Sequence, residues 1–257
     1  MSKYNNIKNK VLFGKYKVNK MIGKGSYGAV FHGINIKDNS EVAIKLESKN
    51  FNYHLLEIES NFLFILKGYG IPEVKSYGKS GNFYVLVEQL LGENLLQIKK
   101  TKKNFTMKEI CLLAIQIIDR IEYVHSKYII HRDIKPENFL LGYKNSPTLY
   151  LIDFGLAKKY RSSRTGKHVK FSKIGKMFGT IKYNSFNAAR GMEQSRRDDL
   201  ESIGYMLIYL INENLPWKGI KLEGKDLQQI IWKVLLLKKI LLLKNYVKIY
   251  LQNLQII

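Results

Sequence analysis

The sequence predicts an α+β fold of two lobes, in which a strand-rich lobe precedes a helical one. Between residues 12 and 47, β-branched and aromatic residues alternate with polar ones, and glycines or the turn residues Lys-Asp-Asn-Ser separate the runs. From residue 105 onward, apolar residues instead recur at helical spacing. The chain has 257 residues, 46% of them hydrophobic, which is enough to bury a substantial core.

The first lobe is expected to contain strands, one helix and then a further strand. Its expected strands are "YKVNKMIG" (residues 16–23), "AVFHGINI" (29–36), "EVAIKLES" (41–48) and "FYVLVEQLLG" (83–92). The helix is expected within residues 50–67, where apolar residues recur at helical spacing. Because the composition changes after Gly92, we place this lobe at residues 1–92.

The second lobe is expected over residues 93–221 and is mainly helical. It begins with the lysine-rich linker "IKKTKKN". Thr106 and Glu109 then form a capping box ahead of a long apolar stripe, which predicts a helix over residues 105–127. Farther on, "YLIDFG" and "DDLESIGYMLIYLIN" alternate with loops. Residues 222–257 form a divergent tail rich in Lys, Leu and Ile, and the sequence contains no internal repeat.

The composition excludes several classes of protein. The single cysteine, Cys111, rules out an intramolecular disulfide, and its place within an apolar helical pattern predicts a buried core thiol. The start "MSKYNNIKNK" lacks the pattern of a signal peptide, and no uninterrupted apolar run reaches the ~18 residues of a membrane span. We therefore expect a protein of a reducing compartment, cytoplasmic and/or nuclear, with no membrane partner.

The net charge of +22 favours anionic partners, such as phosphorylated proteins, acidic peptides, nucleic acids or lipid surfaces. Lysine-rich coding in a biased genome would give the same excess without any functional meaning. The position of the charge in the chain therefore has to decide between the two explanations.

A glycine-rich stretch near the start, "GKGSYGAV", places Gly23, Gly25 and Gly28 in a GxGxxG pattern. Without a Cβ atom at these positions, backbone amides can approach a polyphosphate. The stretch leads into the strand-like "AVFHGIN" and not into a helix, which argues against a dinucleotide-binding loop. The P-loop pattern GxxxxGK[ST] does not occur either. The context favours a flap over the phosphates of ATP.

Lys45 in "EVAIKLE" is the next candidate, because strand alternation places it on the face opposite Ile44 and Leu46. A lysine in such a position is usually solvated unless a carboxylate pairs with it. The following helix offers Glu57 and Glu59, and either could fix the lysine where it grips phosphates. The sequence leaves the choice between the two glutamates open.

Charged residues are unusually dense in "IIHRDIKPENFLL", where they stand between apolar residues. Together with "GKGSYGAV", "VAIK", the helix glutamate and "DFG", this stretch follows the order found in protein kinases, which the chain resembles over most of its length. The resemblance implies a two-lobed kinase-like fold that uses ATP and Mg²⁺ to phosphorylate proteins. Residues 12–221 resemble the casein kinase I family in particular, because "SFN" stands where most kinases have Ala-Pro-Glu and "SRRDDLES" follows.

The resemblance assigns roles to individual residues. Asp133 would orient the substrate hydroxyl and accept its proton, and Lys135 would stabilise the transferred phosphoryl group, as in serine/threonine kinases. Asn138 and Asp153 would hold magnesium ions, and Asp199 would anchor the loop of Asp133 from a buried helix. The residues implied in ATP binding are Ile22, Gly23, Gly25, Ser26, Gly28, Val30, Ala43, Lys45 and Glu59.

A substrate preference is also implied, because casein kinase I enzymes tend to phosphorylate Ser or Thr near acidic or phosphorylated residues. Between Asp153 and Glu193 this chain carries many cations and no acid. Such a cluster can bind a phosphorylated side chain through charge-assisted hydrogen bonds, with Lys182 and Lys221 as the candidate phosphate ligands. A merely solvated basic loop is the alternative. We expect a monomer that acts on such proteins and not on nucleic acid, because no nucleic-acid module surrounds the cluster.

Three departures from the family support a rival interpretation. Glu88 in "VLVEQLLG" takes the place of the usual apolar gatekeeper, beside the expected adenine pocket. Lys182 replaces the family's usual arginine, which keeps the charge but loses the bidentate guanidinium. In the tail after residue 221, no acidic residue follows Asp226, and this composition suits a truncated lobe or a shifted reading frame. The alternative function is a catalytically inactive, kinase-like binding or scaffold protein with an incomplete second lobe.

Overall fold

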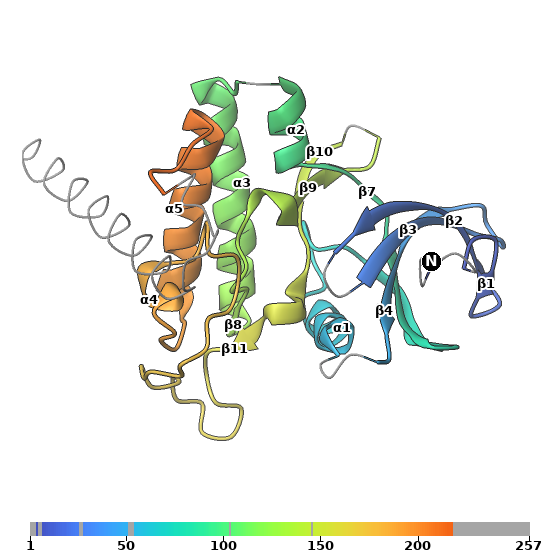
Figure 1. The fold of residues 1–257 in the computed structure, drawn as a ribbon, viewed down its shortest axis with the longest axis horizontal. Helices are drawn as coiled ribbons and strands as arrows, with labels where there is room; N and C mark the ends of the chain where they lie inside the picture. The colour runs from blue at the N-terminus through green and yellow to red at the C-terminus, as the bar shows by residue number, and fades with distance from the viewer. Residues whose placement is uncertain are drawn as a thin grey trace, which may run out of the picture.

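The computed structural model describes residues 4, 7–25, 28–50, 54–102, 104–144 and 146–217. A strand-rich lobe lies beside a helical lobe (Figure 1). This architecture confirms the predicted α+β fold. Ser26, Lys221 and the tail of residues 222–257 lie outside the described residues.

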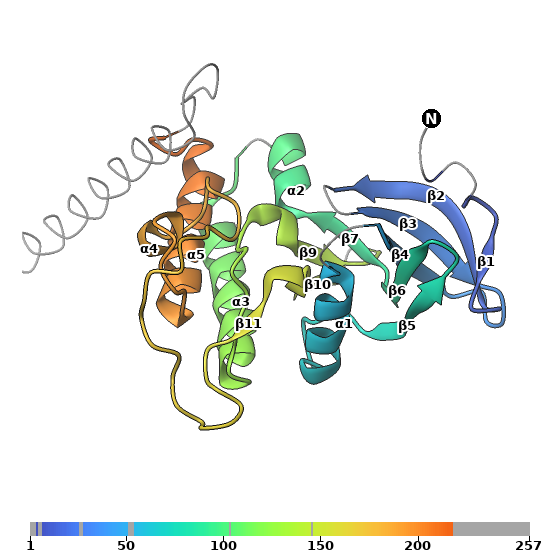
Figure 2. The same cartoon turned by 60° about the horizontal axis from the view of Figure 1, so that its bottom comes forward.

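The strand-rich lobe is built around an antiparallel sheet. Within the described residues this sheet has six strands, in the order β1-β2-β3-β4-β6-β5. They are β1 (Val11–Leu12), β2 (Tyr16–Lys24), β3 (Gly28–Asn35), β4 (Glu41–Ser48), β5 (Val74–Ser80) and β6 (Phe83–Gln89). Helix α1 (Leu55–Ile65) lies against β4, β5 and β6 (Figure 2). The strands expected in this lobe are therefore present with slightly different ends, and β1 and β5 are additions to them.

Side chains on β4 alternate between the two faces of the sheet. Val42, Ile44 and Leu46 are buried in a hydrophobic cluster on one face. Lys45 therefore points to the opposite face, where it contacts Glu59 of α1. The alternation expected from the sequence thus directs the lysine toward the helix.

The helical lobe is organised around two long helices, α3 (Met107–Ser126) and α5 (Arg196–Asn212), which lie side by side (Figure 1). Its other elements are β7 (Leu91–Asn94), α2 (Leu95–Lys102), β8 (Ile129–Ile130), the 3-10 turn η1 (Pro136–Asn138), β9 (Phe139–Gly142), β10 (Ser146–Leu151), the 3-10 turn η2 (Phe154–Leu156), β11 (Lys158–Lys159) and α4 (Phe186–Ala189). Strand β9 pairs with β7 and β10, and β8 pairs with β11. These pairings fix both ends of the loop that contains Asp133, because β8 precedes it and β9 follows it.

The main hydrophobic core spans both lobes. It contains Leu63 of α1, Leu86 of β6, Ile121 of α3 and Met206 of α5, none of which is more than 1% exposed. Burial of such side chains is the chief favourable contribution to folding. Helix α1 is therefore held against the helical lobe as well as against the sheet.

Residues 95–102 form helix α2, so the prediction of a linker over "IKKTKKN" is wrong for most of that stretch. The backbone N–H of Gln97 donates to Asn94 Oδ1 at 2.8 Å, and the backbone N–H of Asn94 donates to Gln97 Oε1 at 2.9 Å. These reciprocal hydrogen bonds satisfy N–H groups at the start of the helix. The lysines stand in its last turn, where the helix dipole favours cations. Lysine-rich composition is therefore compatible with a capped helix here.

Helix α3 begins at the capping box expected from the sequence. The backbone N–H of Glu109 donates to Thr106 Oγ1 at 3.3 Å, and the backbone N–H of Thr106 donates to Glu109 Oε2 at 2.9 Å. Two N–H groups at the start of the helix are satisfied in this way. The predicted capping box is confirmed.

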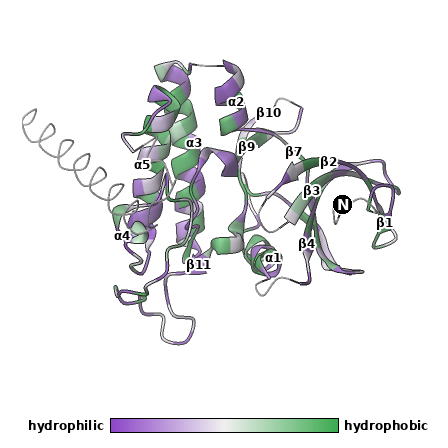
Figure 3. Cartoon of the chain, viewed as in Figure 1, coloured by the Kyte–Doolittle hydropathy of each residue, from purple (hydrophilic) through white to green (hydrophobic). Residues whose placement is uncertain are grey.

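Apolar residues are not confined to the inner face of α3 (Figure 3). Ile110 and Ile117 are buried, whereas Cys111, Leu112 and Ile115 are exposed. Cys111 lies one residue, or about 100°, farther round the helix than Ile110. The prediction of a buried thiol is therefore wrong. None of the helices that the structure describes is long and apolar enough to span a bilayer.

Replacing Thr106 with Ala should lower the free energy of unfolding by about 1 kcal/mol, because one of the first N–H groups of α3 loses its acceptor. Equilibrium denaturation in urea would measure the change. Thr101→Ala is the matched control, since the Thr101 hydroxyl donates only to carbonyl oxygens of its own helix. Equal losses in the two variants would contradict the role of Thr106 as the cap.

Candidate active site

A cavity of about 390 Å³ lies between the sheet, helix α1 and the loops of the helical lobe. The expected site residues that line it are Gly25, Gly28, Val30, Lys45, Glu59, Asp133, Lys135 and Asp153. The described residues Ile22, Gly23, Ala43, Asn138 and Lys182 are not among its lining residues. The cavity thus joins part of the glycine-rich stretch to the loop of Asp133.

Lys45 forms an ion pair with Glu59 of α1, with its Nζ 2.6 Å from Glu59 Oε1. The two side chains are only 13% and 6% exposed. Glu57 points to solvent on the same helix. The geometry therefore settles the choice of partner that the sequence left open.

The position of α1 depends on Glu47 of β4. Its two carboxylate oxygens accept the backbone N–H groups of Leu55 and Leu56, at 3.1 and 3.3 Å. Glu47 thus caps the start of α1 and holds the helix where Glu59, one turn later, reaches the sheet. The sequence does not reveal this role, because a glutamate near the end of a strand gives no signal of the helix that it will cap.

A second carboxylate also reaches Lys45. Glu88 of β6 places Oε1 3.1 Å from Lys45 Nζ, and the charge of Asp153 acts on the same lysine. Burial opposes the charge on Lys45, but Glu59 and Glu88 outweigh it, and the pKa of Lys45 is raised. Burial raises the pKa of Glu59 to about 7, because Lys45 offsets only part of the desolvation and the charges of Asp153 and Glu88 add to it. Three carboxylates therefore share one buried ammonium group.

The glycines of the first loop serve different purposes. A Cβ atom at Gly28 would lie 2.3 Å from the backbone oxygen of Leu46, so the close pairing of β3 with β4 requires glycine there. A Cβ atom at Gly25 would meet nothing within 4 Å. The N–H of Gly25 donates to Gly28 O at 2.9 Å and so belongs to the turn itself. Gly28 therefore serves the sheet, while Gly25 leaves its side of the cavity open.

Asp133 is oriented from two sides. Its Oδ2 lies 2.5 Å from Lys135 Nζ, and its Oδ1 accepts a hydrogen bond from Thr180 Oγ1 at 2.7 Å. Burial opposes the charge on Lys135, but Asp133 outweighs it and the pKa of Lys135 is raised. Thr180 was not predicted from the sequence, because 47 residues separate it from Asp133 and no local pattern links the two.

The loop of Asp133 is anchored by Asp199 of α5, as the resemblance implied. The Asp199 carboxylate is buried and accepts the backbone N–H groups of His131 and Arg132, each at 2.9 Å. His125 Nε2 of α3 lies 2.9 Å from the same carboxylate. Arg132 has a φ of 69°, in the left-handed region that non-glycine residues seldom adopt. Asp199 thus stabilises a strained backbone directly before Asp133.

Asn138 and Asp153 are brought together by the backbone. The N–H of Ile152 donates to Asn138 O at 3.0 Å, and Asp153 follows in the chain. Asn138 Nδ2 donates to Asp133 O at 2.8 Å, which leaves Oδ1 as the acceptor of that side chain. Carboxylate and amide oxygens suit Mg²⁺, which takes few protein ligands and keeps water or phosphate oxygens as the others. The described residues contain no group of three or more His, Cys, Asp or Glu side chains arranged to hold a metal.

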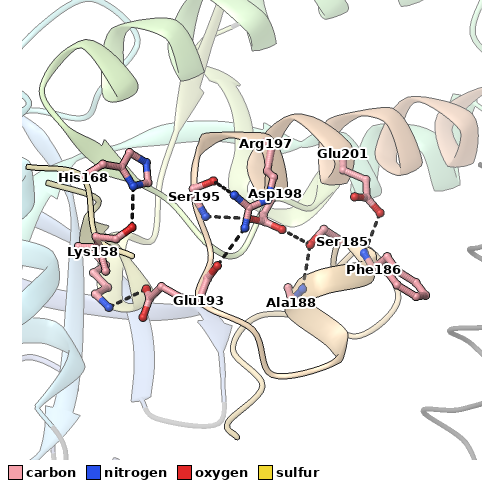
Figure 4. A network of polar contacts seen from close by, with 11 residues as sticks. Lys158, His168, Ser185, Phe186, Ala188, Glu193, Ser195, Arg197, Asp198 and Glu201 are labelled. Carbon is pink, nitrogen blue, oxygen red and sulfur yellow. Dashed lines mark hydrogen bonds and ion pairs between the residues drawn. The ribbon is translucent and has the colours of Figure 1, made fainter. Parts of the chain in front are cut away.

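The element "SFN" ties helix α4 to α5 (Figure 4). Ser185 Oγ accepts the backbone N–H of Ala188 at 3.0 Å and donates to Asp198 Oδ1 at 2.5 Å. The backbone N–H of Phe186 donates to Glu201 Oε1 at 2.7 Å. The serine that carries the family resemblance therefore caps α4 and binds it to the helix of Asp199.

Lys182 does not stand alone as a free phosphate ligand. It is half-buried, and its Nζ lies 3.6 Å from the centroid of the Tyr209 ring, whose face attracts the ammonium group. Between β11 and α4, the exposed lysines and arginines are Arg161, Arg164, Lys167, Lys170, Lys173 and Lys176. The basic character of this surface therefore rests on the loop before Lys182.

The pH dependence of stability follows from Glu59. Because its pKa is raised from the ordinary 4.5 to about 7, the folded chain holds a proton that the unfolded chain releases between those values. The contribution of Glu59 to the free energy of unfolding is fully present below pH 4.5 and is lost as the pH rises through 7. Urea denaturation from about pH 5 to about pH 8 should show the parent losing stability relative to Glu59→Gln. A relative gain by the parent would mean that Lys45 lowers this pKa instead.

A comparison with known families agrees with this geometry. The sequence model of the protein kinase domain matches residues 16–251. The match covers both lobes and continues past residue 221, where the sequence analysis expected the likeness to end. The chain belongs to the protein kinase domain family.

Proposed function

We propose that this chain is an ATP-dependent serine/threonine kinase, which transfers the γ-phosphoryl group of ATP to proteins. The observation that carries the proposal is that one cavity joins the Lys45–Glu59 ion pair to Asp133. A triphosphate gripped by the lysine and a hydroxyl beside the carboxylate would meet in this space. Such positioning supplies most of the catalysis in phosphoryl transfer.

Asp133 is the base of the proposed reaction. The substrate hydroxyl oxygen forms a bond to the γ-phosphorus, the bond from that phosphorus to the bridging oxygen breaks, and ADP leaves. The hydroxyl proton passes to the Asp133 carboxylate, which Thr180 and Lys135 hold in position. The Lys135 ammonium also lies where it would offset charge on the transferred group.

Asn138 and Asp153 are the residues that would hold Mg²⁺. Bound there, the ion would neutralise phosphate charge and align the triphosphate. The oxygen chemistry of the two side chains fits this role, and Asp153 lines the cavity. Lys45, held by Glu59, would contact the phosphates from the sheet side.

The proposed substrates are proteins with acidic or phosphorylated residues near the acceptor Ser or Thr. The exposed cations between β11 and α4 support this preference, since that segment contains no acid to neutralise them. The Ser185 element supports the casein kinase I type, because its hydroxyl performs the capping and anchoring roles described above. We propose that the chain acts as a monomer in the cytoplasm, the nucleus or both.

A kinase-like binding protein without catalytic activity is the second candidate function. Glu88 favours this second function, because its carboxylate pairs with Lys45, the lysine that the phosphates would need for transfer. Binding of Mg-ATP without transfer to any peptide would be its signature. The experiment below separates the two candidates.

The test is phosphate transfer from Mg-ATP to an acidic, pre-phosphorylated serine peptide by the purified chain. Asp133→Ala should lower the rate by about 10²–10⁴-fold, because the base of the reaction is lost. Asp119→Ala is the matched control, since Asp119 is an exposed aspartate of α3 that does not line the cavity. Replacing the acidic and phosphorylated residues of the peptide by alanine should raise its KM.

Two results would contradict this proposal. Equal rates in the parent and Asp133→Ala would show that the transfer comes from another source. A folded parent that binds Mg-ATP but transfers no phosphate would favour the binding-protein function.

A further inference from the structure

Glu88 is a buried carboxylate that the fold itself does little to compensate. Its side chain is 5% exposed, and its Oε1 pairs with Lys45 at 3.1 Å. Its Oε2 is buried and has no hydrogen-bond partner within the described residues. Burying a carboxylate is costly unless hydrogen bonds and opposite charges satisfy it. Stability alone therefore gives little reason for glutamate at this position.

The register of the sheet explains how Glu88 reaches the lysine. In the ladder between β4 and β6, Lys45 pairs with Leu86 and Ala43 pairs with Glu88. Paired residues and residues two apart on one strand share a face of the sheet, so Lys45 and Glu88 lie on the same face. Lys45 is therefore held from two directions, by Glu59 of α1 and by Glu88 of the neighbouring strand.

The donors of the lysine are limited. An ammonium group has three N–H donors. Glu59 accepts one of them at 2.6 Å, and the Glu88 carboxylate forms an ion pair with the same ammonium group at 3.1 Å, so both carboxylates compete with any phosphate for this charge. With an apolar side chain at position 88, only Glu59 would pair with the lysine.

We propose that Glu88 limits the affinity of the site for nucleotide by competing with the phosphates for Lys45. The inference rests on the proposed function, in which Lys45 contacts the phosphates of ATP. A triphosphate must share the Lys45 ammonium group with Glu88 or displace Glu88, whose carboxylate would then be buried without a partner. Both routes weaken binding. Glu88 acts through Lys45 and is therefore a positioning residue.

The test is the Kd of the full chain for a fluorescent, non-hydrolysable ATP analogue with Mg²⁺. Glu88→Gln keeps the shape of the side chain and removes its charge, so it should tighten binding by about tenfold. Glu88→Leu should tighten it as well. Glu57→Gln is the matched control, because it removes an exposed carboxylate of α1 and should leave the Kd unchanged.

Two further measurements separate competition from a structural role. Without nucleotide, Glu88→Leu should unfold at the same temperature as the parent or at a higher one, because the Lys45–Glu59 ion pair remains. In the transfer assay, the KM for ATP should fall in Glu88→Gln by a larger factor than kcat changes. A structural role would instead lower the unfolding temperature.

Lys45→Met distinguishes failure of this inference from failure of the proposed function. If the parent binds the analogue and Lys45→Met does not, the nucleotide site of the proposed function stands, and unchanged or weaker binding by folded Glu88→Gln overturns the competition. If neither the parent nor Glu88→Gln binds the analogue, both the proposed function and the inference are overturned. Tight binding by Glu88→Gln alone would support the inference most strongly.

Discussion

The buried carboxylate of Asp199 is the constraint on which the rest of the site depends. It accepts N–H groups from His131 and Arg132, and it does so at a backbone conformation that would be strained without it. Asp199 belongs to α5, which packs against α3 in the main core. The loop of Asp133 is therefore fixed by the core of the helical lobe, as a precisely oriented carboxylate requires.

The strand-rich lobe determines which charged side chains surround Lys45. Glu47 caps α1 and thereby sets Glu59 against Lys45, while Glu88 approaches the same lysine along the sheet. Buried carboxylates in excess of cations are costly, and a magnesium ion on Asp153 would offset the excess. This connects stability to ligand binding, because the apo site is the state in which the charges are least balanced.

Local sequence patterns predicted much of this arrangement. The features that could not be predicted depend on contacts between residues far apart in the sequence. Strand alternation predicted which face of the sheet Lys45 lies on, and the family resemblance predicted the anchoring role of Asp199. Both predictions rest on short stretches of sequence. Cys111 was placed in the core wrongly, since the apolar stripe of α3 is wider than its buried face. The roles of Glu47 and Thr180 were not predicted, because each contacts a residue of another element and the packing of the fold brings the two together. Sequence periodicity carries no information on such contacts.

A crystal structure of the chain with Mg²⁺ and a non-hydrolysable ATP analogue tests the central claim most directly, namely that one cavity joins nucleotide and base. The account predicts the triphosphate between Lys45 and Lys135, with Mg²⁺ on Asn138 and Asp153. A triphosphate bound outside this cavity, or an empty cavity in crystals grown at saturating nucleotide, would contradict it.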